Sequence, residues 1–114
     1  MSTPPLSALV ADAASAAHGE TRRPAYSQLA DSVEATKEAS VQFAQDVRCV
    51  DVCLRGLEAG DEAIRVAAAM CVKAAAKRAP AFRVALAKSG GIAPLVQMAE
   101  TGSVEAAVRA ALAL

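Results

Sequence analysis

The chain of 114 residues carries 12 basic and 12 acidic side chains, so its formal net charge at pH 7 is zero. Apolar residues make up 54 % of the sequence but aromatic residues only 3 %, and alanine alone supplies about a quarter. One small domain with a thin, alanine-rich core fits these values, whereas a nucleic-acid-binding surface does not, because both a net positive charge and interleaved aromatic side chains are missing.

The first 48 residues are predicted to be helical, because strand-type alternation is nearly absent from the sequence. Their first part, MSTPPLSALVADAASAAHGE, lacks the basic start and the long apolar run of a secretory signal. Nowhere does the chain reach the ~18 uninterrupted apolar residues that a membrane-spanning helix needs, so we expect a cytoplasmic protein without direct membrane insertion. Pro24 is expected to interrupt the long helix of this segment. Residues 1–48 form either a degenerate N-terminal repeat or a helical cap, and the sequence leaves both interpretations open.

The cysteines Cys49, Cys53 and Cys71 are an odd number without framework spacing, which predicts reduced thiols. Cys49 and Cys53 share a helix face, but the single histidine, His18, is distant in the sequence, so we predict no metal site. The three thiols are expected to pack as small apolar side chains. No nucleophile motif accompanies the histidine, so neither catalysis nor a cofactor is predicted.

Glycines at positions 19, 60 and 102 divide the chain at intervals of about 41 residues. The sequence before Gly60, VDVCLRGLEAG, is similar to the sequence before Gly102, IAPLVQMAETG. A period of about 40 to 47 residues built only from helices is typical of HEAT and armadillo solenoids. The spacing therefore predicts an all-α fold made of stacked repeats.

Within one such period, a long helix is predicted after Gly60, with Asp61 as its N-cap. An apolar stripe along this helix, suited to close packing, is predicted at Ile64, Ala68, Val72 and Ala75. A shorter helix follows Gly90 and Gly91, which we interpret as a helix cap rather than a phosphate loop, because no strand precedes them and the Gly-x-x-x-x-Gly-Lys pattern is absent. Pro94 is expected in the first turn of that shorter helix.

Two features of this period carry a family resemblance. The run SGGIAPLV at 89–96 matches the GGI-x-x-LV start of an armadillo repeat, and the pairs Ala68-Ala69 and Ala110-Ala111 match the paired alanines of its third helix. Residues 49–114 therefore resemble the armadillo repeat family, with the last repeat incomplete. The resemblance implies an all-α right-handed superhelix, an armadillo-type solenoid of about 2.5 repeats. The segment KRAPAF is also similar to armadillo proteins of the axonemal central apparatus, which adds a cilium or axoneme to the expected locations, and vacuolar-type armadillo proteins are a second similarity.

The resemblance further implies a non-catalytic scaffold that binds a protein or peptide segment along a concave groove lined by the third helices. Armadillo proteins that carry nuclear cargo place a tryptophan and an asparagine on each groove helix. Met70 and Leu112 occupy the tryptophan positions here and Ala74 an asparagine position, so no site for a nuclear localisation signal is implied. Helix position and charge instead select the expected groove contacts, which are Arg65, Met70, Lys73, Lys77, Arg109 and Leu112.

A basic window without any Asp or Glu extends from Ala63 to Ala99. Its basic residues are Arg65, Lys73, Lys77, Arg78, Arg83 and Lys88. Such a window favours either a basic groove that attracts an acidic partner or a solvated helix face balanced by acidic residues elsewhere. Both interpretations remain open.

The sequence stops inside its last predicted helix, AAVRAALAL. Repeats of this kind bury their apolar faces only against neighbours, and about three are needed for stability. We therefore expect the chain to be the N-terminal part of a longer array, or the product of a truncated gene model. This leads to an alternative function, a structural segment that stacks on further repeats or self-associates through Leu112 and Leu114.

Overall fold

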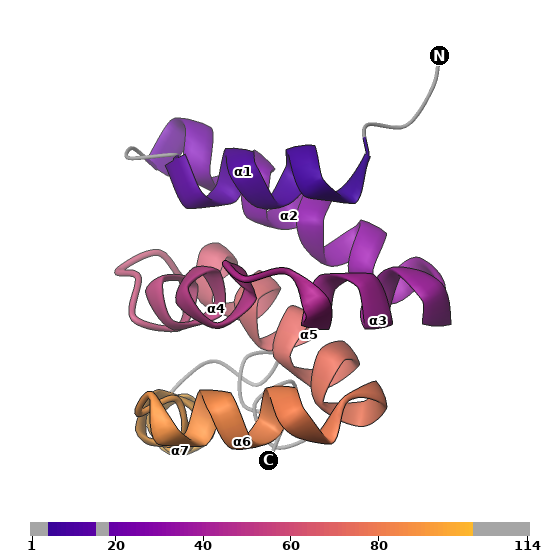
Figure 1. Cartoon of the computed structure of the whole chain (residues 1–114). Coiled ribbons are helices and arrows are strands. Elements are labelled where there is room, and N and C mark those ends of the chain that lie inside the picture. Colours follow the sequence, from indigo (N-terminus) through magenta and orange to yellow (C-terminus); the bar gives the residue numbers. More distant parts are fainter. Residues whose placement is uncertain (1–4, 16–18, 102–114) are drawn as a thin grey trace.

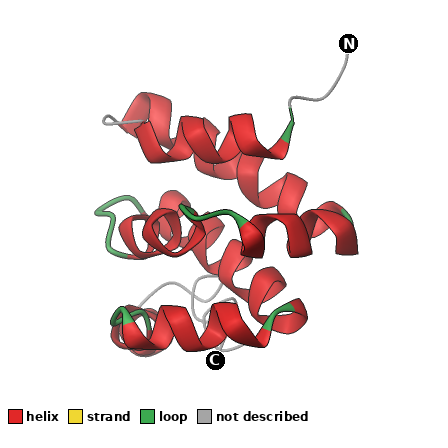
Figure 2. Ribbon diagram, viewed as in Figure 1, coloured by secondary structure: helices red, strands yellow, loops and turns green. Residues whose placement is uncertain are grey.

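The computed structural model describes residues 5–15 and 19–101, and this part of the chain is folded into helices with no strand (Figures 1 and 2). The all-α prediction is therefore confirmed. The helices are α1 (Leu6–Ser15), α2 (Gly19–Ala35), α3 (Lys37–Gln45), α4 (Cys49–Leu57), α5 (Glu62–Arg78), α6 (Pro80–Lys88) and α7 (Ile92–Thr101). Within the described residues, none of these helices combines the length and the apolar character that crossing a membrane requires.

The helices are stacked in chain order (Figure 1). Helices α1 and α2 form one end of the stack, α3, α4 and α5 its middle, and α6 and α7 the other end. The two long helices α2 and α5 lie side by side and run in the same direction, since Arg23 near the start of α2 binds Asp61 before α5, and Glu34 near the end of α2 lies 4.0 Å from Lys73 of α5. Helix α5 also packs against α3, α4 and α6, which makes it the centre of the stack.

Helix α5 begins where the sequence predicts it. The Asp61 carboxylate accepts hydrogen bonds from the backbone N–H groups of Ala63, at 2.8 Å, and Ile64, at 3.3 Å, so Asp61 is the N-cap. The helix ends at Arg78, because Ala79 takes an extended conformation before Pro80.

The buried surface of α5 extends beyond the predicted stripe. All four stripe residues are buried, which confirms the prediction. The neighbouring residues Ala67, Ala69, Cys71 and Ala76 are buried as well, because α2, α3, α4 and α6 surround the helix. Alanine side chains allow these helices to approach closely, so an alanine-rich helix can be covered on most of its circumference.

The expectation that Pro24 interrupts its helix is wrong, because α2 continues through it to Ala35. A proline removes one backbone hydrogen bond and clashes with the preceding turn, at a cost of about 3 kcal/mol in a helix interior. Pro24 lies near the start of α2, and the helix after it is fixed by a buried face of Tyr26, Leu29 and Val33. The hydroxyl of Tyr26 also donates a hydrogen bond of 2.7 Å to the carbonyl of Val52 in α4. The packing of the later turns of α2 therefore outweighs the local cost of Pro24.

The glycine pair between α6 and α7 is a helix cap, as the sequence predicts. Gly90 has a φ of +88°, and its N–H donates to the carbonyl of Ala87 at 3.1 Å. The N–H of Gly91 donates to the carbonyl of Leu86 at 2.9 Å. These two bonds form a Schellman motif, which needs a left-handed residue at the position of Gly90. Pro94 lies in the first turn of α7, as expected.

Candidate functional site

The expected groove contacts do not all lie together. Met70, Lys73 and Lys77 line hollows between α2 and α5, whereas Arg65 lines a different hollow. The other two expected contacts, Arg109 and Leu112, lie outside the described residues, as does Leu114.

Arg65 faces the loop between α4 and α5 rather than α2. Its guanidinium donates a hydrogen bond of 2.7 Å to the carbonyl of Ala59 in that loop. It lines a hollow of about 570 Å³ together with Glu58 and residues of α7 such as Gln97. Arg65 therefore holds the α4–α5 loop on the start of α5, and it is separated from the lysines of the same helix.

The surface between the two parallel helices α2 and α5, which we call the valley, contains two hollows. The first, of about 460 Å³, is lined by Arg23, Ser27, Ala30, Asp31, Glu62, Ala63, Val66, Ala67 and Met70. The second, of about 320 Å³, is lined by Glu34, Ala35, Thr36, Lys37, Ser40, Lys73, Ala74, Lys77 and Arg78. Because lining residues recur at helical spacing on both helices, the two hollows follow each other along one side of α2 and α5.

The first hollow carries acidic side chains and one paired arginine. The Arg23 Nε donates to the Asp61 Oδ2 at 2.9 Å, and this hydrogen bond holds the pKa of the Asp61 carboxyl below its usual range. Asp31 and Glu62 are exposed, and neither forms an ion pair with another described residue. The free charge at this end of the valley is therefore negative.

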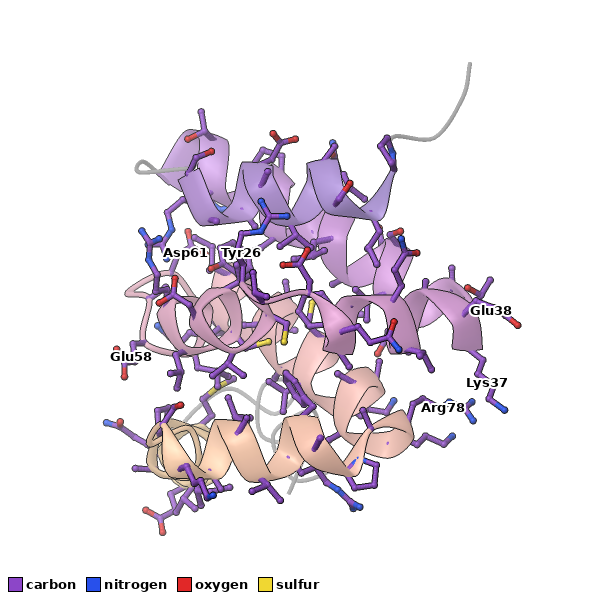
Figure 3. All side chains as sticks on the ribbon, in the orientation of Figure 1. Tyr26, Lys37, Glu38, Glu58, Asp61 and Arg78 are labelled. Carbon is purple, nitrogen blue, oxygen red and sulfur yellow. The ribbon has the colours of Figure 1, made fainter. Side chains whose placement is uncertain are left out.

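The second hollow is basic. The Nζ of Lys73 lies 4.0 Å from the Oε1 of Glu34, so these two charges are paired. Lys37, Lys77 and Arg78 are exposed, and none of them forms an ion pair within the described part of the chain. Figure 3 shows Lys37 and Arg78 on the same side of the molecule, opposite to Asp61. Three cations that repel each other therefore border one hollow, and such an arrangement attracts an anion.

The basic window of the sequence is divided between separate surfaces. Lys73, Lys77 and Arg78 border the second hollow, whereas Arg83 lines an apolar hollow beside α6 and Lys88 ends α6 on an exposed surface. Lys37 completes the basic hollow but was not among the expected contacts, because it belongs to a segment far away in the sequence. The only sequence signal for it is local: a lysine in the first turn of a helix, where a cation is unfavourable.

The cysteines are free and buried, as predicted. Burial raises the pKa of the Cys53 thiol well above its usual value, and the nearby Cys71 and Cys49 add to this effect. Burial likewise raises the pKa of Cys71. Neutral thiols in an apolar core are poor nucleophiles and poor metal ligands. Among the described residues, no three His, Cys, Asp or Glu side chains are grouped in a way that could hold a metal ion.

The valley with its two oppositely charged hollows is thus the candidate site. The charged side chains of its two hollows are the groups that it presents to a ligand. Comparisons of the chain with models of known protein families, with curated protein sequences and with solved structures find no match.

Proposed function

We propose that this chain is a non-catalytic interaction module with armadillo-like repeats, and that it binds an acidic segment of a partner protein in the valley between α2 and α5. The single observation that carries the proposal is the second hollow, where Lys37, Lys77 and Arg78 meet without an ion pair among the described residues. Two long parallel helices separated by shorter ones support a repeat architecture, because successive repeats place equivalent helices side by side.

Burial of the valley floor supports a peptide rather than a free ion as the ligand. Val66, Met70 and Ala74 of α5 are half-buried along the valley, and Met70 has the flexible side chain that suits adaptable contacts. A segment lying there would cover apolar surface between the two charged ends. An isolated anion would use the second hollow alone.

Removing two of the basic side chains is expected to weaken binding of an acidic probe. We expect the variant Lys73→Ala/Lys77→Ala to bind a fluorescein-labelled octaglutamate peptide about 2- to 30-fold more weakly than the original chain at low salt, because exposed charge pairs contribute about 0.2–1 kcal/mol each. Fluorescence anisotropy measures this, and raising the salt concentration should reduce the difference.

The matched control is Arg83→Ala/Lys88→Ala, which removes the same charge from α6 and from outside the second hollow. It should change the affinity far less than the α5 variant. Equal effects of both variants would mean that only the total charge matters. An affinity that neither the α5 variant nor salt alters would contradict the basic hollow as the binding site.

A second candidate function is assembly with further repeats or with another copy of the chain. It is supported by apolar side chains on α6 and α7 that remain exposed, namely Val84, Ile92 and Val96. Helices α6 and α7 form the end of the stack away from α1 (Figure 1). Of the three exposed side chains, Val84 and Ile92 border an apolar hollow of about 290 Å³. Exposed apolar surface of this kind is typical of contact surfaces. Light scattering distinguishes this role, since assembly raises the molar mass with concentration.

A further inference from the structure

We infer that the valley holds its partner segment in one direction only, with acidic residues over the second hollow and basic residues over the first. This inference rests on the proposed function, because it concerns the same valley. It adds that the partner segment carries opposite charges at its two ends. The observation behind it is the opposite sign of the charges without ion pairs in the described part of the chain. Glu62 lies at the start of the valley, Asp31 lies near its middle, and Lys37, Lys77 and Arg78 lie at its other end.

Helix stability explains only part of this charge distribution. Glu62 lies in the first turn of α5, and Lys77 and Arg78 lie in its last turn, where each charge is favoured by the helix dipole. Asp31 lies in α2 well beyond its first turn, so the dipole does not favour it there. Lys37 lies in the first turn of α3, where a cation is unfavourable by about 0.3–1 kcal/mol.

Lys37 is therefore the most informative of these residues. The start of α3 is already capped by Thr36, whose Oγ1 accepts a hydrogen bond of 3.0 Å from the N–H of Ala39, and Glu38 supplies the anion that this position favours. Glu38 does not line the second hollow, whereas Lys37 does. The charge of Lys37 thus does not stabilise α3, but it adds to the positive field of the hollow beside Arg78 (Figure 3).

The two ends of the valley act as separate charge centres. Helix α5 has 17 residues from Glu62 to Arg78, which corresponds to about 25 Å at a rise of about 1.5 Å per residue. This is about three times the Debye length of ~8 Å at physiological ionic strength. Salt ions therefore screen the interaction between the two ends, and each end attracts its own counter-charge. An extended segment of about eight residues spans the same distance. A segment of that length with an acidic and a basic end gains at both ends in one orientation and loses at both in the other.

The test uses the full chain and a synthetic nine-residue peptide, EEEGLGKKK, which carries a nitroxide spin label at its acidic or at its basic end. Broadening of the backbone amide signals of the chain by each label is measured by NMR at physiological ionic strength. We expect the label on the acidic end to cause loss of the signals of Lys37 and Arg78, and the label on the basic end to cause loss of the signal of Glu62. Broadening by both labels at both ends, or in the opposite sense, would overturn the inference while leaving the valley as a binding site.

Exchange of the charges provides a second test of direction. The variant Asp31→Lys/Glu62→Lys/Lys37→Glu/Arg78→Glu reverses both ends at exposed positions, and its fold is checked by circular dichroism. We expect the two labelled peptides to exchange their positions on this variant. An unchanged orientation would overturn the inference, since backbone shape rather than charge would then decide it. If neither this peptide nor octaglutamate binds the original chain at low salt, the proposed function itself fails.

Discussion

Replacing Phe43 by alanine is expected to lower the free energy of unfolding by about 3–5 kcal/mol. The ring of Phe43 is fully buried, and its centroid lies 6.3 Å from that of Phe82 at an interplanar angle of 53°. This tilted pair joins α3 in the middle of the stack to α6 at its end. In a core composed mainly of alanine and other small side chains, few neighbours can move to fill the space of a lost ring, so the cost should lie in the upper part of that range.

Urea unfolding followed by circular dichroism measures this loss, and thermal unfolding should show it as a fall in Tm of more than about 12 °C, at about 4 °C or more per kcal/mol. Val47→Ala is the control, because the side chain of Val47 is 97 % exposed. It should change the stability by less than about 0.5 kcal/mol. A cost below about 1 kcal/mol for Phe43→Ala would mean that the ring of Phe43 is not buried as described.

The parts of the fold that the sequence predicts correctly are those that local chemistry determines. Asp61 begins α5 because its side chain caps the N–H groups two and three residues later. Gly90 ends α6 because the Schellman motif requires a positive φ. Each of these signals acts within a few residues, so no knowledge of the distant parts of the chain is needed to interpret it.

The helix through Pro24 could not be predicted in this way. A local rule gives the cost of the proline, but the compensating contacts come from elsewhere in the fold, such as the hydrogen bond from Tyr26 to Val52 in α4. The width of the buried surface of α5 has the same origin. Its stripe follows from helical periodicity, whereas burial of its other sides depends on how many helices surround it.

The candidate site was predicted in part for the same reason. Charge and helix position identify Lys73 and Lys77, because both lie on one long helix. They cannot show that Arg65, on that same helix, turns to the carbonyl of Ala59. They also cannot show that Lys37 and Arg78 border the same hollow, since this depends on the corner between α2 and α3 meeting the end of α5. A binding surface assembled from separate helices is therefore visible only after the helices are packed.

The packing of α4 against α2 and α5 leads to the second large effect, that of Gly56→Ala. A Cβ atom at Gly56 would lie 2.6 Å from the Cβ of Ala68 in α5 and 2.7 Å from the Cε1 of Tyr26 in α2. Both distances are too short for non-bonded carbon atoms, and the Cβ of Ala68 can move only with the backbone of α5. Overpacking of this kind costs about 1–3 kcal/mol. The better helix propensity of alanine offsets at most about 1 kcal/mol of it, so we expect a net loss of about 1–2 kcal/mol in the free energy of unfolding.

Gly60→Ala makes the same chemical change four residues later and should have the opposite sign. No atom lies within 4 Å of a Cβ built at Gly60, and its φ is not positive. The alanine then only restricts the unfolded chain, which stabilises the fold by about 0.4–1 kcal/mol. Urea unfolding of the two variants under the same conditions compares them directly. If Gly56→Ala were as stable as Gly60→Ala, α4 would not touch α2 and α5 at this point.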